Sequence, residues 1–212
     1  MEKASQKILI KKKRLTKDIY LIHFRKQGDM ARTFLRFQEH YESPKFMNKV
    51  FTHKEFKHWY KKLKGKFSYY QDWDGFNIPS KILKRFYQGH FNPLSKNEKI
   101  LLELFKNEKH NFYIIAVHGK DYKDVLKHEL AHGLFYTNLI YKKMAISIIK
   151  KYSLKHIKKE LLSLGGYNKK ILDDEIQAYA ISLSHELNSE IPKEMQKELI
   201  SLFKVSYQIK KL

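Results

Sequence analysis

The pattern of hydrophobic and polar positions predicts a chain that opens with short strands and closes with helices. Near the N-terminus, the apolar stretches of residues 7–10 and 18–24 predict two strands, separated by a charged segment. The run "NFYIIAV", residues 111–117, is β-branched and aromatic and predicts the clearest strand. The aromatic, turn-rich residues 65–79 predict a strand followed by a loop.

Helical spacing and capping residues predict several helices between these strands. Asp29 is expected to cap a helix that runs through "MARTFLRFQEHYE", where aromatic residues recur at helical spacing. Two capping boxes, Thr52 with Glu55 and Ser95 with Glu98, mark the starts of two further helices. Another short helix is expected just before the second of these capping boxes.

The pattern is helical from Asp121 almost to the end of the chain. A glycine pair at residues 165–166 interrupts it, and Pro192 is expected to start the last helix. That last helix is basic and amphipathic, and we expect it to dock on the rest of the protein rather than to lie on a membrane surface.

Together these elements predict an α+β fold that is predominantly helical. We expect a single domain of residues 1–212, with a small mixed or antiparallel sheet in its N-terminal half, residues 1–109. Residues 110–212 should contribute a central helix packed on the sheet, followed by a helical C-terminal half.

Composition narrows the classes of function. The net charge of +21 would attract nucleic acid, acidic lipid or an acidic protein, but the basic residues are mostly Lys spread along the whole chain. A solvated lysine surface is therefore favoured over a dedicated nucleic-acid site. The absence of Cys excludes disulfides, Cys metal ligands and a cysteine nucleophile.

Hydropathy predicts no transmembrane segment, because the longest apolar run is far too short to cross a bilayer. The N-terminus lacks the long apolar region of a secretory signal. We therefore expect a cytoplasmic protein, with export without a cleaved signal as the alternative.

The stretch "VLKHELAHGLFY" carries the most specific chemistry in the chain. His128 and His132 are four residues apart, so on a helix both imidazoles project from one face and can bind one cation. Glu129 lies about 100° round the helix from His128, where it can reach a metal-activated water without binding the metal. Apolar residues on both flanks predict a buried helix, in which a metal ion would satisfy these polar groups.

A metal site with two His ligands needs a third ligand, and in a chain without Cys this must be Asp, Glu or a further His. The candidate is Glu175 in "ILDDEIQAYAISL", which lies at the border of the buried stripe of a predicted helix. Asp174 is the alternative, although the same helical pattern points it towards solvent. Asp173 fits the helix start, and both aspartates could orient the two histidines through hydrogen bonds.

These two stretches resemble the zincin metallopeptidases, and in particular the gluzincin type. The resemblance covers "NFYIIAV", the "HELAH" helix and the "DEIQAYA" helix, roughly residues 110–187. It implies one Zn²⁺ per chain, bound by His128, His132 and Glu175. It also implies that Glu129 is the general base in the hydrolysis of peptide bonds through a metal-activated water.

Other positions are assigned with less support from the sequence. Tyr136, Tyr179, His118 and Tyr167 are candidates for stabilising the transition state, because they are close in sequence to the motifs. The strand "NFYIIAV" is the candidate for pairing with an extended substrate. The segment "FSYYQDWDGFNIPS" forms either a cleft wall or lid near the site or an aromatic cluster under a loop.

Three functions remain open at this point. The first is a zinc-dependent metallopeptidase acting on a peptide or protein substrate, with an acidic one favoured by the positive charge. The second is a basic module that binds nucleic acid or protein and has a zincin-like core. The third is a zinc hydrolase of a non-peptide amide.

Overall fold

A four-stranded mixed sheet lies at the centre of the protein. The computed structural model describes residues 10–163, 171–182 and 190–211. The strands lie in the order β1-β2-β4-β3, with β2 and β4 parallel and the two outer pairs antiparallel. Their bounds are Ile10–Thr16 for β1, Ile19–Phe24 for β2, Gly75–Pro79 for β3 and Tyr113–His118 for β4.

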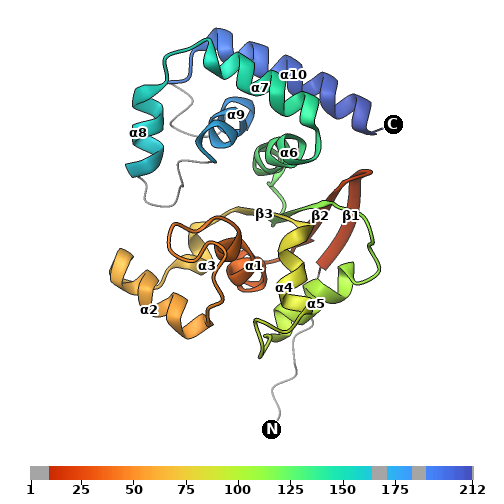
Figure 1. Cartoon of the computed structure of the whole chain (residues 1–212), viewed down its shortest axis with the longest axis vertical. Coiled ribbons are helices and arrows are strands. Elements are labelled where there is room, and N and C mark those ends of the chain that lie inside the picture. Colours follow the sequence, from red (N-terminus) through yellow and green to blue (C-terminus); the bar gives the residue numbers. More distant parts are fainter. Residues whose placement is uncertain (1–9, 164–170, 183–189, 212) are drawn as a thin grey trace.

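Helices cover both faces of the sheet (Figure 1). Alternate residues of β2 and β4 point into two separate hydrophobic cores, which explains why both strands are apolar at almost every position. One face packs against helices from the first half of the chain. These are α1 (Gln27–Glu42), α2 (His53–Lys64), α3 (Tyr69–Asp72), α4 (Leu83–Tyr87) and α5 (Lys96–Phe105), with the 3₁₀ turn η1 (Ser80–Ile82) before α4.

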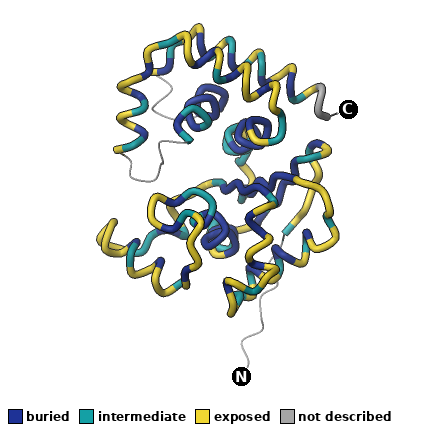
Figure 2. The backbone as a smooth tube through the Cα atoms, in the orientation of Figure 1, coloured by how far each residue is buried: buried dark blue, intermediate teal, exposed yellow. Residues whose placement is uncertain are grey.

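The helices of the second half lie on the opposite face of the sheet. Their bounds are Lys123–Thr137 for α6, Leu139–Lys150 for α7, Lys155–Ser163 for α8, Leu172–Ser182 for α9 and Lys193–Lys211 for α10. Figure 2 shows that α6 and α9 are largely buried, whereas α7, α8 and α10 each expose one face. The helix α10 docks on α7 and α9, as its amphipathic pattern predicts.

The predicted α+β, predominantly helical fold is confirmed, and the sheet is mixed rather than purely antiparallel. Both predicted capping boxes are present at the starts of α2 and α5. The predicted break at residues 165–166 lies outside the described residues. Within the described part of the chain, no helix is both long and apolar enough to cross a membrane.

Three local predictions were wrong. The charged segment after Ile10, which was expected to separate the strands, is part of β1, because an edge strand can pair on one side and leave lysines in solvent. Residues 7–9 of the first predicted strand lie outside the described residues. Residues 65–79 were expected to form a strand followed by a loop, but the strand β3 comes last, after the short helix α3. Asp29 lies in the first turn of α1, whose N-cap is Lys26, so its carboxylate acts near the helix N-terminus without capping it.

Candidate metal centre

Two buried helices, α6 and α9, bring the motif residues together. The helix α6 follows the central strand β4 and lies between the sheet and α9. Gly133 allows this close packing, since a Cβ there would come within 3.0 Å of the Ile19 side chain on β2. The "HELAH" helix therefore faces the sheet on one flank and α9 on the other, as its apolar flanks predict.

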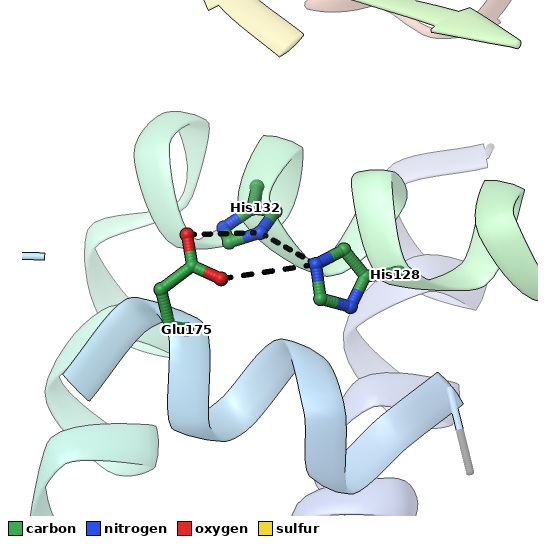
Figure 3. A group of neighbouring side chains, drawn as sticks. All are labelled: His128, His132 and Glu175. Carbon is green, nitrogen blue, oxygen red and sulfur yellow. Dashed lines mark hydrogen bonds and ion pairs between the residues drawn. The ribbon is translucent and has the colours of Figure 1, made fainter. Parts of the chain in front are cut away.

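His128, His132 and Glu175 converge on one point between α6 and α9 (Figure 3). The two Nε2 atoms of the histidines lie 3.2 Å apart. The carboxylate oxygens of Glu175 lie 3.8 Å from Nε2 of His132 and 3.9 Å from Nε2 of His128. Among the described residues, this is the group of His and acidic side chains whose ligand atoms could hold one metal ion.

The spacing suits a small divalent ion. Tetrahedral zinc with bonds of about 2.0–2.1 Å separates its ligand atoms by about 3.3 Å, close to the distance between the two imidazoles. One ligand atom from each of the three residues lies within 4.8 Å of the others, so the carboxylate would need to approach the imidazoles to bind the same ion. Two imidazoles and a carboxylate are ligands that zinc accepts, so the residues present fit the ion that the sequence motif implies.

Asp174 orients His132. Its Oδ1 lies 2.9 Å from Nδ1 of His132, and because an ionised carboxylate only accepts hydrogen bonds, Nδ1 is the donor. This leaves the Nε2 lone pair of His132 directed at Glu175 and His128. The Gln177 amide donates to the same Asp174 oxygen at 3.0 Å, and Tyr141 in turn donates to Gln177 at 2.6 Å.

The prediction that Asp174 points to solvent was wrong. Every residue of α9 from Glu175 to Ser182 is buried, because α6, α7 and α10 all pack against this helix. The side of α9 that the amphipathic pattern assigned to solvent is covered by α6. Asp173 instead forms an ion pair with Lys158 at 2.7 Å, so of the two aspartates it is Asp174 that supports a histidine of the metal centre.

Glu129 is held beside the metal centre by the edge strand β3. The Asn77 side-chain amide donates to Oε2 of Glu129 at 2.5 Å, and the Tyr113 hydroxyl donates to the other end of the same amide. This pair of contacts fixes the orientation of Asn77, so its NH₂ group faces the carboxylate. Gly75 leaves room for Glu129, since a Cβ at Gly75 would lie 2.3 Å from Oε1.

The centre is rich in carboxylate. Burial raises the pKa of Glu175 to about 7 and also raises the pKa of Glu129, with Asp174 adding to both shifts. Burial alone would lower the pKa of His132, but Asp174, Glu175 and Glu129 outweigh it and raise that pKa well above its usual value. Three buried or half-buried acids around the two imidazoles favour a cation at this place.

The candidate transition-state residues lie at different distances from the centre. The ring of Tyr179 contacts the ring of His128, with 4.8 Å between centroids. Tyr136 is partly exposed and packs on Tyr113, and His118 lies at the end of β4 beside Asp74. Tyr167 lies outside the described residues.

The prediction that the strand "NFYIIAV" pairs with an extended substrate was wrong. It forms β4, which is paired on both sides by β2 and β3 and has no free edge. The free edge next to α6 belongs to β3. There, the backbone N–H of Asn77 already donates to Oε1 of Gln38 on α1, at 3.2 Å.

The segment "FSYYQDWDGFNIPS" contributes both to the hydrophobic core and to the surroundings of Glu129. Tyr69 and Phe76 are buried in the core, while Gly75 and Asn77 contact Glu129. The assignment of Asn77, Gly75 and Tyr113 to the support of Glu129 could not be made from the sequence, because these residues come from strands distant from "HELAH". The contact between Gln177 and Asp174 could have been predicted, since Gln177 lies three residues after Asp174 and hence on the same side of the helix.

Comparison of the chain with protein-family models, with curated proteins and with solved structures gave no match.

Proposed function

We propose that this protein is a zinc-dependent metallopeptidase, with His128, His132 and Glu175 as zinc ligands and Glu129 as general base. The observation that carries the proposal is the convergence of three ligand groups from two helices, each of which offers one ligand atom within 4.8 Å of the others. Glu129, which the resemblance to gluzincins makes the general base, is anchored by Asn77 next to this point rather than among the ligands.

The number of ligands supports a catalytic rather than a structural zinc. Structural zinc sites are usually closed by four protein ligands, whereas catalytic sites have three and leave one position open. In the described part of the chain the cluster offers three, two imidazoles and one carboxylate. A bound zinc ion would supply Lewis acidity towards a carbonyl and would lower the pKa of water in that open position.

The proton transfers of the reaction would be carried out by side chains of the protein. In peptide hydrolysis, a water oxygen adds to the scissile carbonyl, its proton goes to Glu129, and Glu129 delivers that proton to the amine as the C–N bond breaks. Burial raises the pKa of Glu129, which moves the carboxyl towards the range where it can both accept and return a proton. Asn77 and Tyr113 hold Glu129 in place for both transfers.

The test compares the wild type with Glu129→Gln on a peptide mixture obtained by digesting a proteome. Both proteins should bind one zinc per chain, and only the wild type should generate new peptide termini. Cleavage by the wild type should stop on chelation and return when zinc is added back. Glu103→Gln, at an exposed position on α5, is the matched control and should cleave normally.

Two results would contradict the proposal. Purified protein that binds far less than one zinc per chain, even when zinc is supplied, would remove the metallopeptidase assignment. Equal cleavage by the wild type and by Glu129→Gln would show that Glu129 is not the base. Zinc binding with hydrolysis of small amides but not of peptides would instead favour an amide hydrolase.

A further inference from the structure

A cavity of about 100 Å³ lies beside the metal centre, between the C-terminal end of α1, the helix α2 and the start of β3. Gly75 forms part of its wall and is also the residue in contact with Glu129. Gln38, another wall residue, bonds both to the backbone N–H of Asn77 and to the carboxylate of Glu42. The cavity is thus joined to the residues that position the proposed general base.

The walls of the cavity are aromatic. Trp59, Tyr60, Tyr69, Trp73 and Phe76 all line it, with Tyr69 and Phe76 buried in the core and Trp73 partly exposed. Aromatic faces of this kind bind aliphatic chains and also attract cations through their ring electrons.

Two carboxylates, Glu39 and Glu42, also line the cavity. They are three residues apart in the last turn of α1, so their side chains leave the helix on the same side. Among the described residues, neither carboxylate forms an ion pair with a Lys, Arg or His side chain. Lys64, the one cationic residue of the lining, makes no ion pair with either. Burial raises the pKa of Glu39 to about 7, and burial together with the nearby Glu175 carboxylate raises the pKa of Glu42 well above its usual range.

The Tyr69 hydroxyl lies in the same cavity, beside Glu39. Tyr69 is 1% exposed, and burial together with the Glu39 carboxylate raises the pKa of its hydroxyl. A hydroxyl oxygen can accept a hydrogen bond while its own proton is donated, so an N–H group of a ligand in the cavity would find an acceptor here.

We propose that this cavity is a substrate subsite for a lysine or arginine side chain next to the scissile bond. The aromatic rings would pack on the aliphatic part of that side chain, and Glu39 and Glu42 would pair with its charged end. The Tyr69 hydroxyl would accept a hydrogen bond from the same group. This inference rests on the proposed peptidase function, and it names a basic substrate residue even though the surface of the protein as a whole is strongly positive.

The test measures peptide binding by the zinc-loaded Glu129→Gln variant, so that it does not depend on hydrolysis. The probes are short peptides of one length in which a single lysine is moved through every position, each paired with a norleucine and a glutamate version. At one position we expect lysine to bind about tenfold more tightly than norleucine, which has no charge, and glutamate to bind most weakly.

Glu39→Gln and Glu42→Gln, each added to Glu129→Gln, should reduce the lysine preference to about twofold or less, while Glu103→Gln should leave it unchanged. Zinc content and circular dichroism establish that each variant is folded. Equal binding of lysine and norleucine peptides at every position overturns the subsite, and this comparison requires no cavity variant. A lysine preference that survives both substitutions also overturns it.

The two proposals fail in distinguishable ways. A lysine preference that depends on Glu39 or Glu42, in a protein whose wild type hydrolyses no peptide, would retain the subsite and remove the peptidase function. Cleavage by the wild type without any preference for basic residues would do the reverse.

Discussion

Replacing Asp174 by Asn should weaken zinc binding through its effect on His132, one of the proposed zinc ligands. The carboxylate accepts a hydrogen bond from Nδ1 of His132 at 2.9 Å, and the His132 side chain is only 4% exposed. The substitution keeps an oxygen that can accept this bond but removes the charge that makes His132 a stronger ligand.

The size of the effect follows from the strength of that contact. A hydrogen bond to an ionised partner contributes about 1.5–3 kcal/mol, compared with about 1 kcal/mol for a neutral one. The difference, about 1.3 kcal/mol at the middle of that range, corresponds to about tenfold or slightly less in affinity. Asp174→Ala, which removes the acceptor altogether and leaves Gln177 without it, should cost up to about 100-fold.

A zinc titration in competition with a chromophoric chelator measures these affinities. Asp173→Asn is a matched control, because it removes the same charge one residue away, from a carboxylate paired with Lys158 at 2.7 Å. It should bind zinc within about twofold of the wild type. Equal losses in the two Asn variants would assign the effect to long-range charge, and an unchanged affinity for Asp174→Asn would refute the role given to this carboxylate.

Further variants test the support of Glu129 and the stability of the fold. Gly75→Ala places a methyl group 2.3 Å from the Glu129 carboxylate, so peptide hydrolysis should fall at least about tenfold with zinc still bound, and normal kcat/KM would contradict this. Glu98→Gln breaks the buried pair with Arg36, whose two contacts are 2.6 Å, and should lower the free energy of unfolding in urea by about 3–5 kcal/mol; a loss below about 1 kcal/mol would contradict it. Burial alone would raise the pKa of Glu98, but contacts with His53 and Arg36 hold it at about 2, so its contribution to stability is complete above its unfolded pKa of about 4.3 and is lost as the pH falls towards 2. Unfolding measured between pH 5 and 2 should therefore depend less on pH in Glu98→Gln than in the wild type.

The three proposed metal ligands could be predicted from the sequence because each depends on a pattern within one helix. The spacing of His128 and His132 places both imidazoles on one face of α6, and the apolar stripe of α9 places Glu175 at its border. The structure brings these three side chains together as predicted.

The supporting residues could not be predicted, because they depend on which elements pack against one another. Asp174 is directed at His132 only because α6 covers the side of α9 that its own pattern leaves polar. Asn77 reaches Glu129 only because β3 forms the sheet edge beside α6. The charged residues of β1 likewise form a strand because β2 offers them a partner, which no local pattern reveals.

The most direct test of the metal centre is zinc X-ray absorption spectroscopy on the purified protein loaded with one equivalent of zinc. We expect two imidazole nitrogens and carboxylate or water oxygens at about 2.0–2.1 Å from the zinc, in four-coordinate geometry. The imidazole contribution should decrease in His132→Ala. A six-coordinate spectrum like that of aqueous zinc, or a wild-type spectrum without imidazole ligands, would contradict the assignment of His128, His132 and Glu175 as the site.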